Sequence, residues 1–144
     1  MRRKLVLPLF DFPTAPAAAP MRVTLSRAAG WRMPENTAKV DRSTRFGNPF
    51  WVSPDGSLTY LHPRTGVGIH HGKGWTLETM LGAYHSWVQG KPMLCPDGST
   101  ISGLSCKPPS AAELQTLRGK NLACWCKVDS MCHADVLLAI VNRR

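Results

Sequence analysis

The sequence lacks several features that would place it in a simple functional class. No stretch approaches the ~20 consecutive apolar residues of a membrane-spanning helix, so we expect no membrane partner. Basic residues outnumber acidic ones by 18 to 9, for a formal net charge of +9, yet no run of five or six basic residues occurs. The sequence therefore does not support a polybasic nucleic-acid-binding tail. The excess charge suits either an anionic partner, such as nucleic acid, a nucleotide or another phosphorylated small molecule, or simply a solvated basic surface.

The sequence also lacks the cysteine pattern of a disulfide-linked secreted domain. Its five cysteines are an odd number, and three of them lie with a histidine in the ten positions from Cys124 to His133. We therefore expect reduced cysteines and a cytoplasmic location. The apolar stretch near the N-terminus is too short for a secretory signal and is closed by Asp11, which agrees with that expectation.

The length allows one domain with a substantial core but not two. Residues 1–20 contain many alanines and prolines and predict a flexible N-terminal arm. Residues 21–144 predict a single domain. Its expected elements are short strands at 22–27 and 38–41, hairpins around Pro-Asp-Gly within 51–60 and 93–102, helices at 76–90, 110–119 and 132–142, and a buried strand at 121–126.

Two of these helices have clear N-terminal signals. Thr76 can cap the first, and the Ser110–Glu113 pair forms a capping box for the second. Strands near the start followed by helix, strand and helix at the end favour an α/β or α+β class. We expect a small sheet with flanking helices, in which the C-terminal strand–loop–helix carries the cysteines and histidine.

The C-terminal segment C-W-C-K-V-D-S-M-C-H contains four residues that can bind a metal ion: Cys124, Cys126, Cys132 and His133. A tetrahedral zinc ion takes four thiolate or imidazole ligands. Cys124 and Cys126 would share one face of a strand, but Cys132 and His133 would diverge by about 100° at a helix start. Common structural sites also place two residues between paired cysteines. Zinc is therefore one candidate cofactor.

The same segment is a candidate catalytic or ligand-binding site. It joins the carboxyl end of a strand to a helix, and ligands gather at that edge of α/β sheets. Free N–H groups at the helix start favour phosphate or carboxylate. The partial positive charge at a helix start also lowers the pKa of a nearby thiol. Cys126 and Cys132 are therefore candidate nucleophiles, and His133 is a candidate acid or base. We expect Asp135 to line the same wall.

Each of these residues also has a purely structural interpretation. Cysteine packs like a small hydrophobe, which is the favoured interpretation for Cys124, with Trp125 beside it in a packed strand. His133 can be a hydrogen-bonded core histidine, because apolar residues follow it on one helix face. Asp129 or Ser130 is well placed to cap the helix.

A second segment, R-S-T-R-F-G-N-P-F at 42–50, has the composition of an anion-binding loop. Arg42 and Arg45 can clamp an anion, Ser43 offers a hydroxyl, and Gly47 allows a close approach of the backbone, with Asn48 beside it. The alternative interpretation is a rigid turn with two surface arginines.

Residues 22–50 and 117–142 together resemble domain-of-unknown-function family 4326, found in bacteria and their phages. The shared motifs are G-W-R-M-P at 30–34, R-S-T-R-F-G-N-P-F at 42–50 and G-K-N-L-A-C-W-C…C-H-A-D-V-L-L at 119–138. The resemblance covers nearly the whole chain after residue 21. It implies a domain of about this size, in the host cytoplasm if the gene is a phage gene, and it implies no reaction.

Two departures from the family pattern stand out. Residues 92–109, which contain the second hairpin, look like an insertion, so Cys95 and Cys106 are poor candidates for a shared site. Asp41 stands where the family usually has glycine, which would alter a close approach of the backbone to a ligand.

The favoured hypothesis is a pocket for a phosphorylated ligand, a nucleotide or a nucleic-acid end, between the 42–50 segment and the cysteine–histidine segment. One alternative is a zinc-stabilised nucleic-acid-binding module. Another is a non-catalytic accessory protein that binds a host protein, for which exposed Trp75 or Trp87 would be the anchors. Whether the protein is an enzyme stays open.

Overall fold

The segment N-L-A-C forms the centre of the main sheet. In the computed structural model, which describes residues 19–143, this segment is strand β8 (Asn121–Cys124). Strands β1 (Arg22–Thr24) and β2 (Thr37–Lys39) flank it, both parallel to it. Central parallel strands are covered on both faces, and Leu122 and Ala123 are accordingly fully buried. The sheet therefore joins the beginning and the end of the chain.

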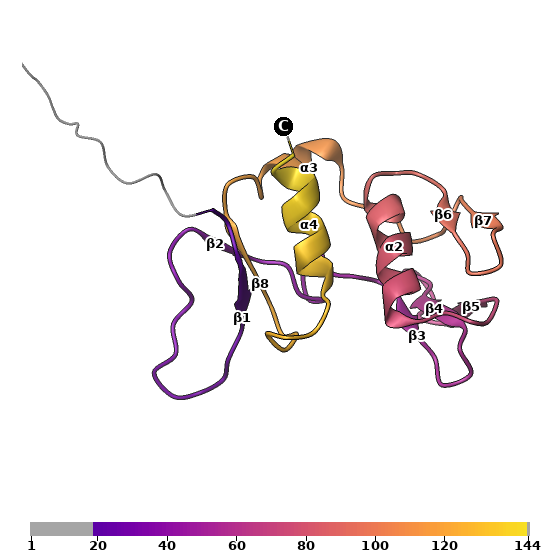
Figure 1. Cartoon of the computed structure of the whole chain (residues 1–144), viewed down its shortest axis with the longest axis horizontal. Helices are drawn as coiled ribbons and strands as arrows, with labels where there is room; N and C mark the ends of the chain where they lie inside the picture. The colour runs from indigo at the N-terminus through magenta and orange to yellow at the C-terminus, as the bar shows by residue number, and fades with distance from the viewer. Residues whose placement is uncertain (1–18, 144) are drawn as a thin grey trace, which may run out of the picture.

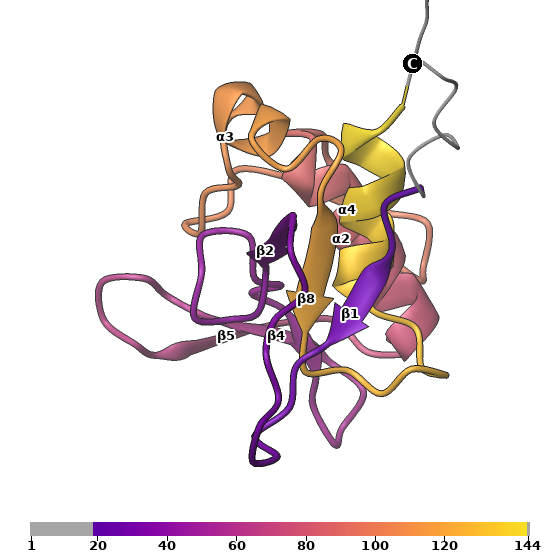
Figure 2. The same ribbon diagram turned by 90° about the vertical axis from the view of Figure 1, so that its left-hand side faces the viewer.

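Two helices lie on one side of this sheet. Helix α4 (His133–Val141) stands between the sheet and helix α2 (Leu77–Val88), as Figure 1 shows. Figure 2 looks onto the opposite face of the sheet, with both helices behind it. The position of α4 between two layers explains why its sequence is apolar on most sides. The predicted fold class is confirmed as α+β.

Both predicted hairpins are present. Strands β3 (Trp51–Val52), β4 (Leu58–Leu61) and β5 (Gly68–His71) form an antiparallel sheet, and β6 (Met93–Leu94) pairs with β7 (Thr100–Ile101). Both Pro-Asp-Gly turns use the same local bonds. The Asp55 carboxylate accepts from the Ser57 amide and hydroxyl, and Asp97 and Ser99 repeat this arrangement.

The aromatic core lies between α2 and the antiparallel sheet. The Phe50 ring contacts the rings of Tyr60 and Trp87 edge to face, with centroids 5.9 Å and 5.4 Å apart. Trp75 and Trp87 are only 4% and 7% exposed. Both belong to the core, so neither offers an exposed anchor for a partner.

The predicted helix caps are confirmed, with one change of length. Thr76 caps α2 and shares a capping box with Thr79. Ser110 and Glu113 form the predicted box at α3 (Ala111–Gln115). Helix α3 is shorter than the predicted 110–119 because the chain continues in turns to Gly119, which has a φ of 78°.

Two further expectations concern the N-terminal arm and the lack of a membrane-spanning helix. The arm predicted at 1–20 lies outside the described residues except for its last two positions. Among residues 19–143, no helix has the length and apolar character needed to cross a bilayer.

Candidate functional site

The two segments that carry the candidate site residues meet because the main sheet is parallel. Strands β2 and β8 run in the same direction, so the chain leaves both of them at the same edge of the sheet. The turn 41–48 follows β2, and the loop 125–131 leads from β8 to α4. Ligand sites in parallel sheets form at this carboxyl edge. The topology thus brings together the two segments that the sequence hypothesis required.

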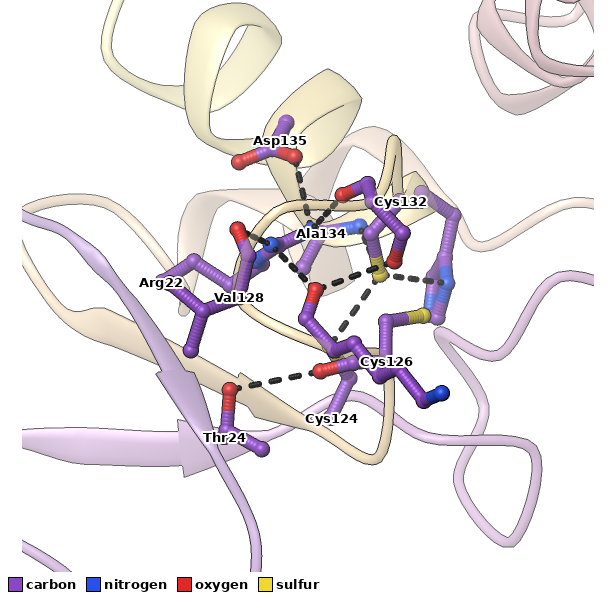
Figure 3. Close-up of polar contacts among 11 residues, drawn as sticks. Arg22, Thr24, Cys124, Cys126, Val128, Cys132, Ala134 and Asp135 are labelled. Atoms are coloured by element: carbon purple, nitrogen blue, oxygen red, sulfur yellow. Dashed lines mark hydrogen bonds and ion pairs between the residues drawn. The ribbon is translucent and has the colours of Figure 1, made fainter.

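Arg22 of β1 holds the loop 125–131 in place. Its guanidinium donates to the backbone carbonyls of Lys127, Val128 and Ser130, and Nη1 lies 3.0 Å from the Asp135 carboxylate (Figure 3). The Arg22 side chain is only 10% exposed. Because a guanidinium has five donors in a rigid fork, one side chain can fix a loop that has no regular structure of its own.

The loop brings three sulfur atoms together. The sulfurs lie within 4.8 Å of one another and belong to Cys124, Cys126 and Cys132, here called the thiol cluster. The sulfurs of Cys124 and Cys132 are 3.1 Å apart. Figure 3 shows the three side chains converging from the end of β8, the loop and the start of α4. The sequence pattern C-x-C…C therefore becomes one compact group in three dimensions.

Two local expectations for this segment are wrong. Strand β8 ends at Cys124 rather than continuing through 126, and Trp125 is 41% exposed. Neither Asp129 nor Ser130 caps α4; Cys132 is the N-cap, and its sulfur accepts from the Ala134 amide. The reason is tertiary: β1 and β2 pair with the chain no further than Cys124, and Arg22 shapes the loop that follows.

The thiol cluster favours a single negative charge. The hydrogen bond from Cys124 lowers the pKa of Cys132 well below the ordinary thiol value, against burial, and contacts with His133 and Cys126 act in the same direction. The same bond, with burial, raises the pKa of Cys124, and burial raises the pKa of Cys126. Without a cation, one thiolate is thus stabilised by two neighbouring thiols.

His133 is buried beside the thiol cluster with a defined orientation. Its Nε2 lies 2.6 Å from the carbonyl oxygen of Val40, and its ring meets Tyr84 edge to face. Because a carbonyl only accepts, Nε2 carries the proton. The other nitrogen, Nδ1, faces the Cys132 sulfur at 3.6 Å. His133 is therefore both hydrogen-bonded to the core and placed beside a thiol.

A cavity of about 300 Å³, here called the thiol cavity, opens over this cluster. Its floor contains the thiol cluster and His133, and the turn 41–48 supplies Asp41, Arg42, Ser43 and Asn48. Leu77, Met80 and Leu81 of α2 form an apolar wall. Such a mixture of apolar walls with a few converging polar groups is typical of small-molecule sites.

Asp41 and Trp125 join the two halves of the cavity. The indole Nε1 donates to the Asp41 carboxylate at 2.8 Å, and Ser43 donates to the same carboxylate through its amide and hydroxyl. Burial raises the pKa of Asp41, but the bonds from Ser43 and Trp125 outweigh it and hold that pKa below its ordinary value. A neighbouring Lys39 acts in the same direction.

Of the other predicted ligand-binding residues, Arg45, Gly47 and Asp135 lie outside the thiol cavity. Arg45 lines a neighbouring cavity of about 330 Å³, together with Gly47. The close approach at Gly47 is to its own chain, because a Cβ there would lie 2.5 Å from the Cα of Arg42. Asn48 lines both cavities, but its amide serves the turn by accepting from the Phe50 amide. Asp135 faces Arg22 and does not line the thiol cavity.

Sequence reasoning missed the parts played by Arg22 and Trp125. Arg22 is one basic residue among 18, and nothing in the sequence places it beside a loop more than 100 positions away. Trp125 has the local pattern of a core strand residue. A weak signal existed for Asp41, since Asp-x-Ser is the pattern of a turn in which a carboxylate accepts from the residue two positions on.

Comparison with known protein families and structures completes the description of the site. No curated protein and no solved structure is significantly similar to the chain. A family described as "Domain of unknown function (DUF4326)" matches residues 23–143. That match includes both segments that form the thiol cavity. The chain therefore belongs to this family.

Proposed function

We propose that the thiol cluster binds one Zn²⁺ ion and that the fourth coordination position of this ion faces the thiol cavity, where it takes a ligand. The observation that carries the proposal is the convergence of three sulfurs within 4.8 Å at the cavity floor. Zn–S bonds of about 2.3 Å at tetrahedral angles place sulfurs about 3.8 Å apart. Shifts below about 1 Å would therefore close the cluster around an ion.

The charge of the cluster supports a cation. Three thiolates at this separation repel one another. The raised pKa values of Cys124 and Cys126 leave these two thiols protonated when no cation is bound, while the lowered pKa of Cys132 leaves it as the thiolate. A divalent ion removes this repulsion by binding all three as thiolates. Sulfur ligands select soft or borderline ions over magnesium and calcium, and zinc suits a tetrahedral thiolate set.

The cavity supports a bound ligand in addition to the ion. Zinc sites with three protein ligands and an open position are the type that binds or activates a small molecule. Arg42 lines the same cavity, while the Asp41 charge is already balanced by hydrogen bonds from Ser43 and Trp125. An anionic ligand, such as a phosphorylated molecule or a nucleic-acid end, therefore fits here, with a metal-binding group on the ion and its negative charge beside Arg42.

Metal analysis of the reduced full-length protein tests this proposal. We expect about one equivalent of zinc after gel filtration, and sulfur-to-metal charge-transfer absorption when cobalt replaces zinc. Cys126→Ser should abolish both signals, and Cys95→Ser, outside the cluster, should leave both intact. Protein that binds no zinc after incubation and desalting, while remaining folded, would refute the proposal.

The fourth position needs its own test. Nδ1 of His133 lies 3.6 Å from the Cys132 sulfur, and it would close the site if it bound the ion as a fourth ligand. We expect His133→Asn to keep about one equivalent of zinc, because three sulfurs suffice. Loss of zinc from this variant, in protein that remains folded, would instead identify a closed four-ligand site.

A second candidate function is supported by the Cys132–His133 pair. A thiol beside an imidazole whose other nitrogen is held by a carbonyl resembles the nucleophile, base and orienting group of thiol enzymes. In that case the reduced, zinc-free protein would be the functional form. Rapid alkylation of Cys132 by iodoacetamide in zinc-free protein, slowed by His133→Asn and not by added zinc, would favour this candidate over the metal centre.

A further inference from the structure

The neighbouring cavity, here called the cationic cavity, differs sharply in charge from the thiol cavity. Its volume is about 330 Å³, and it is lined by three cationic side chains, Arg42, Arg45 and Lys107, with Trp51 among them. Among the described residues, no acidic side chain lines it. Arg42 and Asn48 line both cavities, so the two adjoin at the turn 41–48.

The two arginines are held in fixed positions by backbone carbonyls. Arg45 donates from its two Nη atoms to the carbonyls of Lys107 and Pro108, at 3.2 Å and 3.1 Å. Arg42 donates from Nη2 to the Phe50 carbonyl at 3.0 Å, and its guanidinium lies 5.8 Å from the centre of the Trp51 ring. A guanidinium has five N–H donors, so each keeps donors for a ligand after making these bonds.

Preorganised cations are the arrangement that a phosphate group requires. Two anchored guanidinium groups and one ammonium can pair with several oxygens of a phosphate, and such charge-assisted bonds are the stronger kind. Because the arginines are already positioned, a ligand would lose little free energy in ordering them. Three of the 18 basic side chains gather here at a concave site beside the thiol cavity, although Nε of Arg45 also lies 3.4 Å from the Glu113 carboxylate.

We propose that the cationic cavity binds the phosphate groups of a phosphorylated small molecule. The rest of this molecule extends past Arg42 into the thiol cavity. This second part of the proposal rests on the proposed function, whereas the phosphate site does not. We favour a small molecule over a polynucleotide because the cations line one hollow rather than an extended groove. Lys107 lies in the segment 92–109, so this site depends partly on what looks like an insertion in the family.

Calorimetric titration with inorganic pyrophosphate tests the phosphate site in the full chain. We expect binding of about one equivalent, weakened roughly tenfold by Arg42→Gln and by Lys107→Gln, because each removes one charge-assisted contact. The matched control is Arg64→Gln, which removes one positive charge in an exposed loop outside both cavities. Its effect should stay within about twofold, as expected for a screened charge.

Three results would overturn this proposal. The first is no heat of binding at millimolar pyrophosphate, and the second is an equal loss in Arg64→Gln and Lys107→Gln, which would indicate a general basic surface. The third is single-stranded DNA binding far more tightly than pyrophosphate, with a steep salt dependence. The zinc-free variant Cys126→Ser should still bind pyrophosphate, so failure of the phosphate site and failure of the metal site are distinguishable.

Discussion

The thiol cavity and the cationic cavity lie on two sides of the same turn, yet they have opposite chemistry. The turn 41–48 contributes Asp41 and Ser43 to the thiol cavity and Thr44 and Arg45 to the cationic cavity. Arg42 reaches both. One short segment thus separates a cluster suited to a cation from a hollow suited to an anion. Under the two proposals above, the ligand presents a phosphate at one end and a metal-binding group at the other.

Beside each cavity, one arginine side chain anchors a loop of the backbone. A single arginine donates to loop carbonyls and pairs with a carboxylate in each case: Arg22 at the thiol cavity and Arg45 at the cationic cavity. They differ in exposure, because the Arg22 side chain is 10% exposed and that of Arg45 is 49% exposed. Buried hydrogen bonds to a charged group contribute more than exposed ones. The thiol cavity should therefore be the more rigid of the two.

The largest expected effect is a loss of bound zinc when the thiol cavity is changed, but not when the cationic cavity is changed. Cys126→Ser should reduce bound zinc from about one equivalent to near none and should remove the stabilisation that zinc provides against urea. Cys106→Ser, a matched change in the cationic cavity, should leave zinc content unchanged. Elemental analysis and urea unfolding with and without chelator would measure both. Zinc loss from both variants would mean that the two cavities are not chemically separate.

The next effect concerns the two anchoring arginines. Arg22→Gln should lower the free energy of unfolding by about 3 kcal/mol, because three loop carbonyls lose their charged donor. Arg45→Gln should lower it by less than about 1 kcal/mol, as for an exposed ion pair. Urea titrations of both variants would provide the comparison. Equal losses would show that burial does not distinguish the two anchors.

A single methyl group should disturb both cavities at once. In Gly47→Ala the new Cβ would meet three backbone atoms of Asp41 and Arg42 at 2.5 to 3.0 Å, and backbone cannot move aside as a side chain can. We expect a loss of about 2 kcal/mol, together with weaker binding of both zinc and pyrophosphate. Gly82→Ala is the control, because a Cβ there meets nothing within 4 Å. A stable variant with both bindings intact would contradict a shared turn.

The smallest expected effect is a pH dependence at Asp41. Its pKa is lower in the folded protein than the ordinary value of 3.8, so its stabilisation is present above that pH and is lost as the pH falls through the folded value. Asp41→Asn should cost about 1 kcal/mol at pH 7 and much less in strong acid. Urea unfolding with chelator present would test this, with exposed Asp129→Asn as the control. A pH-independent difference between Asp41→Asn and the wild type would count against this account.

Local structure was largely predictable because it depends on neighbouring residues. The Pro-Asp-Gly hairpins and the caps at Thr76 and Ser110 follow from turn and helix-end chemistry acting over three or four positions. The strand end at Cys124 and the cap at Cys132 were not predictable, because both depend on Arg22 and the pairing of β1. The insertion predicted at 92–109 and the assigned site roles stay predictions.

The sequence by itself indicated which two segments carry the candidate site residues: the cysteine–histidine segment and the 42–50 segment. That conclusion needs only residue type and spacing. The tertiary structure alone decided that both segments meet, since two parallel strands release them at one edge of a sheet. It also decided how they divide: three sulfurs face one cavity, while Arg45 and Lys107 face the next. Long-range packing determines which side of a turn each side chain occupies, so this cannot be predicted from the neighbouring residues in the sequence.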